Sequence, residues 1–427
     1  MLFRRHSRLA WTLILGWILG CCAAYASEPP RYALRSARML DVDSGRILEN
    51  VTVVIAGGRI EAVNPPGLPE GLEVVDLGDR TLLPGLMDLH THLLYSLEGD
   101  WVHRAVKESP ADAALRGARN AAVTLKAGFT TVRDVGGTGF ADIALARAID
   151  GGTVEGPRMV PAGHSLGITG GHCDTTGYAP GIAEEGPEEG TADGPEQMLR
   201  AVRYQIKHGA KVIKICATAG VLSFEGPVGA QQFSYEEMAA AVEEAQRHGL
   251  KVAAHAHGAE GILAAVKAGV SSIEHGSILT DEIIAEMKRR GTYLVPTTYL
   301  ADAIDLSALP APIRAKAEWI LPRAKDSLRR AIAAGVPIAF GTDAGVYPHG
   351  LNAREFASLV DRGMTPLQAI QSATIRAVDL LGVDDRGVIA PGKLADLVAV
   401  AGNPLDDITQ MSEVRYVVLG GELVHRP

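Results

Sequence analysis

Between residues 86 and 382, short runs rich in β-branched residues alternate with longer, alanine-rich amphipathic stretches. This alternation is typical of repeated βα units, which build a parallel sheet covered by helices. Eight such units over roughly 300 residues match a (β/α)8 TIM barrel with insertions, a fold of the α/β class. The runs are residues 86–92, 130–135, 158–162, 211–217, 251–256, 271–275, 293–297 and 337–344.

Two flanking segments, residues 27–85 and 383–427, instead show short strand patterns separated by turns such as Gly57-Gly58. We expect them to pair into one small β-sandwich beside a barrel domain of residues 86–382. A different feature, residues 167–194, is rich in Gly, Pro, Glu and Asp and lacks periodicity. It predicts a long loop after the third strand, and long loops inside compact domains are usually functional.

The first 26 residues resemble a secretory signal peptide. Basic Arg4, Arg5 and Arg8 precede an apolar run, and Ala24-Tyr25-Ala26 offers a small-residue cleavage site. We therefore exclude residues 1–26 from the fold and expect a periplasmic or secreted protein with no transmembrane domain after processing. The alternatives are a retained membrane anchor, for which the run is short, and a lipoprotein attached at Cys21.

Charge and cysteine content narrow the partners. The formal net charge of −9 argues against binding to nucleic acid or to an anionic membrane, and favours a small-molecule or peptide substrate.

After cleavage of the signal peptide, Cys173 and Cys216 are the two cysteines that remain, too few for a framework of several disulfides. Export would permit a bridge between them, but we expect two independent thiols. The sequence leaves the oligomeric state open, including a homo-oligomer.

Ligand-type residues recur at the ends of the predicted barrel strands. In His90-Thr91-His92 the two imidazoles are two residues apart, so they point to the same face of a strand. Active sites of such barrels form at the carboxyl ends of the strands. Because histidine and carboxylate recur there on several strands, the pattern predicts a metal site. The candidate ligands are His90, His92, Lys214, His255, His275 and Asp343.

Lys214 stands out in this set because an ammonium group does not bind metals. Carboxylation by carbon dioxide would convert it into a carbamate able to bridge two divalent ions, and burial near cations favours the neutral amine that reacts. Lys211 competes for this role, but it lies three residues earlier and on the opposite face of the strand. The alternative is a structural lysine of the barrel.

Several motifs together resemble the amidohydrolase superfamily, over nearly the whole chain after residue 26. Within it, the sequence is most similar to the imidazolonepropionase-like branch, which includes Xaa-Pro dipeptidases (prolidases) and related carboxypeptidases. The motifs are Pro84-Gly85-Leu86-Met87-Asp88-Leu89-His90-Thr91-His92, Val212-Ile213-Lys214, His255-Ala256-His257-Gly258, Glu274-His275-Gly276, Gly341-Thr342-Asp343, Pro391-Gly392-Lys393-Leu394-Ala395-Asp396-Leu397 and Gly402-Asn403-Pro404-Leu405.

The resemblance implies two divalent metal ions. His90, His92 and Asp343 would hold one, His255 and His275 the other, and carboxylated Lys214 with a hydroxide would bridge both. Zinc is the usual metal in relatives, although the sequence does not choose among zinc, cobalt and manganese. Asp343 would be the catalytic residue, accepting the hydroxide proton and passing it to the leaving amine.

Three further histidines are candidates around the substrate. His172, in the long loop, resembles a position that contacts substrate in relatives, and His164 is its local rival. An ordinary solvated loop histidine is the alternative for either one. His257 follows His255 by two residues and could face the same way, so we assign it to the surroundings of the metal site or to substrate binding.

The leading hypothesis is an exported hydrolase that cleaves the amide bond of a dipeptide or an N-acyl amino acid. A cyclic amide hydrolase such as an imidazolonepropionase is the first alternative, but the leader peptide and Lys214 count against it. A lactonase or a hydrolase of toxin amides is a second alternative. A non-catalytic exported binding protein would be expected to lack some ligands, whereas all six are present.

Overall fold

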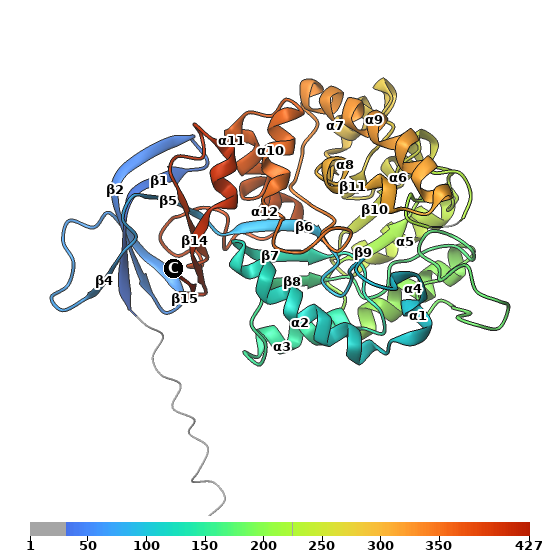
Figure 1. Ribbon diagram of the computed structural model, residues 1–427, viewed down its shortest axis with the longest axis horizontal. Helices are drawn as coiled ribbons and strands as arrows, with labels where there is room; N and C mark the ends of the chain where they lie inside the picture. The colour runs from blue at the N-terminus through green and yellow to red at the C-terminus, as the bar shows by residue number, and fades with distance from the viewer. Residues whose placement is uncertain (1–30, 224) are drawn as a thin grey trace, which may run out of the picture.

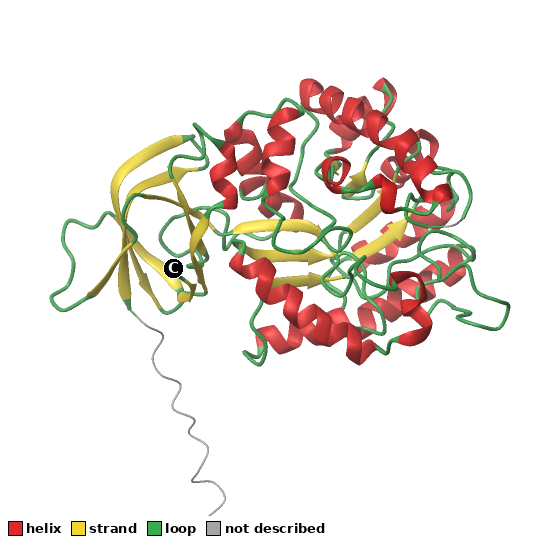
Figure 2. Cartoon of the chain, in the orientation of Figure 1, coloured by secondary structure: helices red, strands yellow, loops and turns green. Residues whose placement is uncertain are grey.

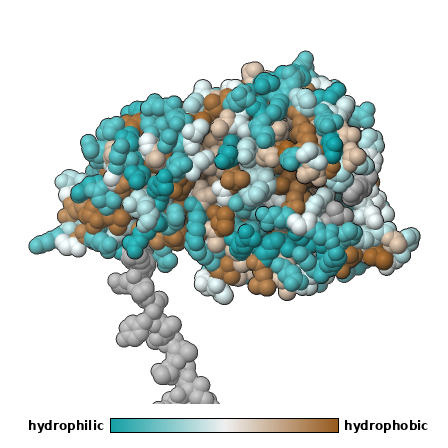
Figure 3. Space-filling view, in the orientation of Figure 1, coloured by the Kyte–Doolittle hydropathy of each residue, from teal (hydrophilic) through white to brown (hydrophobic). Residues whose placement is uncertain are grey.

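The computed structural model describes residues 31–223 and 225–427, so the predicted signal peptide and the Cys21 lipidation site lie outside the described residues. Two parts stand side by side in Figure 1: a β-sheet domain and a larger α/β domain covered by helices. Within the described residues, no helix is long and apolar enough to cross a membrane. The face drawn in Figure 3 is mostly hydrophilic, with hydrophobic residues in scattered patches.

The larger domain contains the predicted parallel strands. β6, β7 and β8 form one sheet, and β9 to β12 form another. The backbone joins the two sheets where Leu166 exchanges hydrogen bonds with β9, accepting one from the N–H of Cys216 and donating one to the carbonyl of Lys214. The strands are β6 (Leu86–Thr91), β7 (Phe129–Asp134), β8 (Arg158–Pro161), β9 (Ile213–Cys216), β10 (Val252–Ala256), β11 (Ser272–His275) and β12 (Tyr293–Val295).

The eighth predicted strand, residues 337–344, is less regular than expected. It closes the ring through isolated bridges, from Ile338 to Leu294 of β12 and from Ala344 to Thr91 of β6. Its hydrogen bonding to β6 is irregular at Thr342. The N–H of this residue donates both to the side chain of Asp88 and to the carbonyl of His90. The barrel fold is nevertheless confirmed, since this segment hydrogen-bonds to both neighbours.

Helices surround these strands, as the alanine-rich stretches predicted (Figure 2). Ser234 and Glu237 form a capping box at the start of α5, and Thr365 forms another at α11 with Pro366 in the first turn. The α-helices are α1 (Arg104–Lys107), α2 (Pro110–Lys126), α3 (Ala141–Asp150), α4 (Pro195–His208), α5 (Tyr235–Arg247), α6 (Ala259–Ala268), α7 (Asp281–Arg290), α8 (Leu300–Ala303), α9 (Ala311–Ala334), α10 (Arg354–Asp361), α11 (Pro366–Ser372) and α12 (Ile375–Leu381). The 3-10 helices are η1 (Trp101–His103), η2 (Leu306–Ala308) and η3 (Ile408–Ser412).

The two terminal segments pair as expected and form one mixed sheet. Antiparallel pairing of β5 with β13 joins the N-terminal strands to the C-terminal ones. Gly58, in the turn after β2, accepts a hydrogen bond from the N–H of Ala395, so the sheet curls over its own apolar core. The strands are β1 (Tyr32–Asp41), β2 (Arg46–Ala56), β3 (Arg59–Val63), β4 (Glu73–Asp76), β5 (Arg80–Pro84), β13 (Leu397–Ala401), β14 (Val414–Leu419) and β15 (Glu422–His425).

Candidate active site

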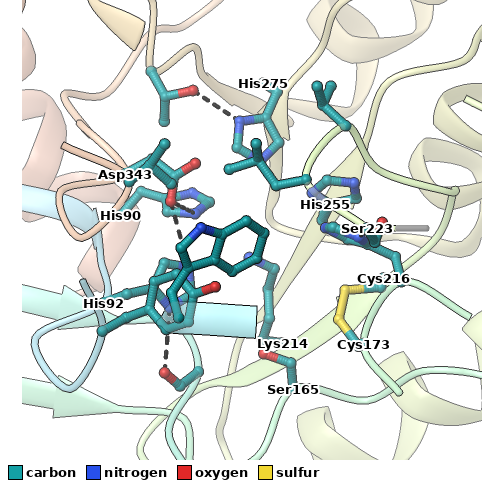
Figure 4. A pocket seen from close by; sticks show the side chains of 18 of the residues that line it. His90, His92, Ser165, Cys173, Lys214, Cys216, Ser223, His255, His275 and Asp343 are labelled. Atoms are coloured by element: carbon teal, nitrogen blue, oxygen red, sulfur yellow. Dashed lines mark hydrogen bonds and ion pairs between the residues drawn. A yellow bond between two sulfur atoms is a disulfide. The ribbon is translucent and has the colours of Figure 1, made fainter. Parts of the chain in front are cut away.

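A cavity of about 540 Å³ opens where the barrel strands end. The six predicted ligands all line it, and so do His172, His257 and His164. Figure 4 shows His90 and His92 on one side of the cavity, His255 and His275 on another, and Lys214 reaching in between. The tertiary structure therefore brings together every side chain that the strand-end pattern singled out.

One group of donors combines β6 with the segment after β12. Oδ1 of Asp343 lies 3.6 Å from Nε2 of His90 and 3.5 Å from Nε2 of His92. His90, His275 and Asp343 each offer a ligand atom within 4.8 Å of the other two. His275 therefore lies close to this first group of donors, although the sequence analysis assigned it, with His255, to the second metal ion.

A second group consists of three histidines. Ligand atoms of His255, His257 and His275 lie within 4.8 Å of one another. Nε2 of His255 is buried with no hydrogen-bond partner among the described residues, which is a costly arrangement unless the nitrogen has another ligand. His257 lies as close to this group as the two predicted ligands do, while its Nδ1 contacts Oγ of Ser277 at 2.7 Å.

Hydrogen bonds from outside the cavity orient the imidazoles. Nδ1 of His275 contacts Oγ1 of Thr297 at 2.8 Å, and this hydroxyl itself donates to the carbonyl of Pro296. The hydroxyl must therefore accept from His275, which places the proton on Nδ1 and leaves Nε2 with a free lone pair. Nδ1 of His92 likewise donates to the carbonyl of Gly136 at 3.2 Å. Metal-binding histidines are commonly fixed in this way.

A buried ion pair supports His90 in the same manner. Oε2 of Glu274, on β11, lies 2.7 Å from Nδ1 of His90, and Oε1 accepts a hydrogen bond from Arg133 of β7 at 2.8 Å. Sequence reasoning missed both residues as part of the site. Their signal was present in the sequence, because a charged residue within a fully buried strand needs a specific partner.

Lys214 and Lys211 differ as predicted. Lys214 is 3% exposed and lines the cavity, and burial lowers the pKa of its ammonium group to about 8. The Lys211 side chain is 55% exposed and lies 3.9 Å from Asp150 on the outside of the barrel. A lowered pKa increases the fraction of neutral amine at physiological pH, which is the form that can react with carbon dioxide.

Asp343 is held in a strained backbone conformation at the mouth of the barrel. Its φ of 60° lies in the left-handed region, which is unusual for a residue other than glycine. Asp88 accepts hydrogen bonds from both the N–H and the hydroxyl of the neighbouring Thr342, and so fixes this turn. Burial raises the pKa of Asp343 to about 7.

His172 and His164 occupy different environments. The His172 ring lies 4.2 Å from the ring of His255, and its Nδ1 contacts Oγ of Ser223 at 2.7 Å. His164 instead accepts a hydrogen bond from the N–H of Gly139 and contacts the amide oxygen of Gln205. His172 is therefore the one of the two that stands against a predicted metal ligand, and neither is a freely solvated loop histidine.

The two cysteines correct an expectation. Cys173 and Cys216 form a disulfide, with their Cα atoms 6.0 Å apart, and are not independent thiols. The long loop after β8 folds back across the end of β9, so residues 43 positions apart in the sequence meet. Sequence spacing alone carries no information on this approach, since loop conformation decides it.

The donor set fits divalent metal ions. Burial lowers the pKa values of His90, His255 and His275 well below the usual range, so these imidazoles are neutral and can donate lone pairs. Imidazole nitrogen and carboxylate oxygen are the ligands of catalytic zinc and related metals. The unpartnered Nε2 of His255 points to the same conclusion.

Comparisons with known proteins agree with this geometry. The profile of the amidohydrolase family matches residues 81–424. Ochratoxinase from Aspergillus niger is 37% identical over 371 residues, which cover 81% of this chain and 76% of that protein. A crystal structure of a Xaa-Pro dipeptidase with bound methionine is 40% identical, has a TM-score of 0.88, and covers 92% of this chain and 100% of its own.

A second solved structure, a prolidase complexed with N-methylphosphonate-L-proline, is 33% identical with a TM-score of 0.86. It covers 93% of this chain and 100% of its own chain. The family match spans both the barrel and the parts of the flanking sheet that adjoin it. The chain belongs to the amidohydrolase family and is a hydrolase that acts on amide bonds.

Proposed function

We propose that this chain is an exported, binuclear metal-dependent amidohydrolase that cleaves the amide bond of dipeptides or N-acyl amino acids. The observation that carries the proposal is the convergence of the predicted ligands on one cavity at the strand ends. Their side chains come from β6, β9, β10, β11 and the closing segment after β12. Packing of a barrel does not require such polar groups at these positions, so a shared chemical role explains their meeting.

In this proposal His90, His92 and Asp343 hold one metal ion, and His255 and His275 hold the other. Zinc is the metal expected from the resemblance to the family. The neutral amine of Lys214 attacks the carbon of carbon dioxide, forms an N–C bond while a C=O electron pair moves to oxygen, and loses a proton. The resulting carbamate would supply anionic oxygen ligands to the metal ions. When bound, the two cations would polarise the scissile carbonyl and lower the pKa of water.

The remaining chemistry belongs to the protein side chains. Asp343 accepts a proton from the attacking water and delivers it to the nitrogen of the leaving group. Glu274 and Thr297 hold the His90 and His275 rings in place from outside the cavity. His172, whose ring lies 4.2 Å from that of His255, would contact the substrate.

The cavity wall favours substrates with a bulky apolar group. Apolar side chains from the region of α8 and from α9 line the cavity that also contains the ligands. They are Leu300, Ile304, Ile320, Leu321 and Ala324. This wall suits an N-acyl amino acid as well as a dipeptide. A toxin amide is the second candidate substrate, because one relative is named ochratoxinase. An imidazolonepropionase activity is less favoured, since the relative of that name from Deinococcus radiodurans is 27% identical.

Export is part of the same proposal. The disulfide between Cys173 and Cys216 supports it, because disulfides persist in oxidising compartments and are rare in the reducing cytosol. The sequence of residues 1–26 supports it independently. Amino-terminal sequencing of the protein recovered from the periplasm or the medium would test it, and a first residue at Ser27 is expected.

The decisive experiment combines metal analysis with a substrate panel. We expect about two metal ions per chain by mass spectrometry, and hydrolysis of members of a dipeptide and N-acyl amino acid panel. Lys214→Ala should abolish turnover, and a short carboxylic acid should partly restore it by taking the place of the carbamate. Lys211→Ala is the matched control, because this lysine lies outside the cavity, and it should retain full activity.

One metal ion per chain or none, together with full activity of Lys214→Ala, would rule out the binuclear mechanism. Hydrolysis of no amide in the panel by the metal-loaded protein would rule out the proposed substrate class. Preference for N-acyl amino acids with aromatic acyl groups over dipeptides would select the second candidate.

A further inference from the structure

The Cys173–Cys216 disulfide lies at the edge of the cavity. Cys216 follows Lys214 by two residues on β9, so both side chains point to the same face of the strand. Cys173 comes from the long loop after β8, and both cysteines line the cavity. Figure 4 shows the disulfide beside Lys214 and Ser223. The bond therefore joins the loop directly to the strand that carries the predicted bridging residue.

The residue next to this bond is His172, and its ring is closely surrounded. Its centroid lies 4.2 Å from that of the tilted His255 ring, its Nδ1 contacts Oγ of Ser223, and its backbone N–H donates to Oε1 of Gln232 at 3.1 Å. A Cβ atom at Gly220 would lie 2.1 Å from the ring, so only glycine leaves room for it. The position of His172 thus depends on close packing that a small shift of the loop would break.

Other attachments of the loop lie toward its ends or within it. The N–H of Gly167 donates to the carbonyl of Gly190, and the hydroxyl of Thr169 donates to Asp193. Further along, Thr175 donates to Glu185, which is in the same loop. These bonds shape the loop, whereas the disulfide, together with the contacts of His172 with Gln232 and Ser223, attaches it to β9 and to the segment that follows β9. Closing a loop of this length by a covalent bond removes many alternative conformations.

We propose that Cys173 and Cys216 are positioning residues, whose disulfide holds His172 against His255 and so makes efficient hydrolysis depend on the oxidised state of this pair. The inference rests on the proposed function, because it assigns His172 a role toward the substrate in that reaction. Residues 174–189 of the same loop contribute further side chains to the cavity wall, so loosening the loop would also widen the substrate site. The enzyme would then work best in the compartment to which its leader directs it.

The test compares the oxidised and reduced protein. A water-soluble trialkylphosphine breaks the S–S bond, takes up oxygen from water to become the phosphine oxide, and leaves a thiol on each cysteine. It is chosen over dithiols, because dithiols also remove metal ions. Reduction should lower kcat/KM by about 10- to 100-fold, since misplacing a group by about 1 Å can cost that much. Metal content per chain should stay constant.

A second measurement does not depend on activity. Diethyl pyrocarbonate modifies accessible histidines, and mass spectrometry gives the modification rate of His172 alone. This rate should rise several-fold on reduction, and so should deuterium exchange in residues 170–190. Cys173→Ala should reproduce both changes without reductant. The Cys173→Ala/Cys216→Ala variant is the control for side effects of the phosphine. Adding the phosphine should change neither the kcat/KM of this variant nor the modification rate of its His172.

A purely stabilising disulfide would lower Tm on reduction and leave kcat/KM at 25 °C and the modification of His172 as they were, which would overturn the inference. If the oxidised protein hydrolyses nothing in the panel, the proposed function fails, and the modification rate of His172 still decides whether the disulfide positions this ring. An unchanged rate then refutes the positioning role independently of the reaction.

Discussion

Oε2 of Glu274 lies 2.7 Å from Nδ1 of His90 inside a fully buried part of the barrel. A carboxylate only accepts hydrogen bonds, so His90 carries its proton on Nδ1 and directs Nε2 into the cavity. The other oxygen of Glu274 is bound to Arg133, whose guanidinium also donates to Ser272 and to the carbonyl of Leu89. Strands β6, β7 and β11 are thereby joined behind one predicted metal ligand.

The first prediction concerns this ion pair. Glu274→Gln should weaken metal binding by about 10- to 100-fold, because the charged acceptor that orients His90 is lost. Isothermal titration calorimetry, in which zinc is added to the metal-free protein, measures this affinity directly. The variant also leaves Arg133 buried without its counterion, which alone costs about 3–5 kcal/mol of folding stability.

The double variant Glu274→Gln/Arg133→Met separates the two effects. It removes the unpaired charge while keeping similar volume, so Tm should recover relative to Glu274→Gln, whereas metal affinity should stay low. Recovery of metal affinity together with Tm would show that Glu274 acts on overall stability and not on His90.

The second prediction concerns Glu355 on α10. Its two oxygens accept hydrogen bonds from the N–H groups of Thr298 at 2.8 Å and Tyr299 at 2.7 Å, directly after Thr297, which holds His275. Glu355→Ala leaves two donors without acceptors in this interior region. At about 1–3 kcal/mol each, the loss of both acceptors should lower the free energy of unfolding by about 2–6 kcal/mol.

Urea denaturation of the metal-free protein measures this change without the contribution of bound metal. Glu282→Ala is the matched control, since that side chain is 67% exposed and only faces Lys267 at 3.5 Å. It should change stability by less than about 0.5 kcal/mol. Equal effects of the two substitutions would contradict the supporting role of Glu355.

The third prediction is a pH dependence of stability away from the active site. Hydrogen bonds from Arg203, and then from Arg247, lower the pKa of Glu244 on α5 to about 2. In the unfolded chain this pKa is about 4.3, so the charged form is favoured in the folded state. The stabilisation is fully present above about pH 5 and is lost as the pH falls toward about 2.

Glu244→Gln should therefore lower Tm at pH 7, and the difference from the unaltered protein should narrow as the pH falls to 3. Differential scanning calorimetry at several pH values measures it. Glu243→Gln changes a neighbouring carboxylate that is 68% exposed, and it should leave Tm nearly unaltered. A Tm difference for Glu244→Gln that is constant from pH 7 to pH 3 would contradict the argument.

Local patterns in the sequence were sufficient to predict the barrel and to place the candidate ligands at the ends of its strands. A period of two in strands places His90 and His92 on one face, and the carboxyl ends of parallel strands must meet at one end of the barrel. The capping boxes at Ser234 and Thr365 are local features of the same kind, since their hydrogen bonds span only three residues. The eighth run departs from a regular strand at Thr342, whose backbone N–H donates to the side chain of Asp88.

Features that depend on contacts between distant segments were not predictable. Pairing of Cys173 with Cys216, the choice of His172 over His164 beside His255, and the approach of His257 to His275 depend on how loops fold over the barrel. The sequence by itself determined the residue types, their strand-end positions and the family, because these follow from local periodicity and motifs. Only the tertiary structure decided which side chains meet, since burial and distance arise from packing of the whole chain.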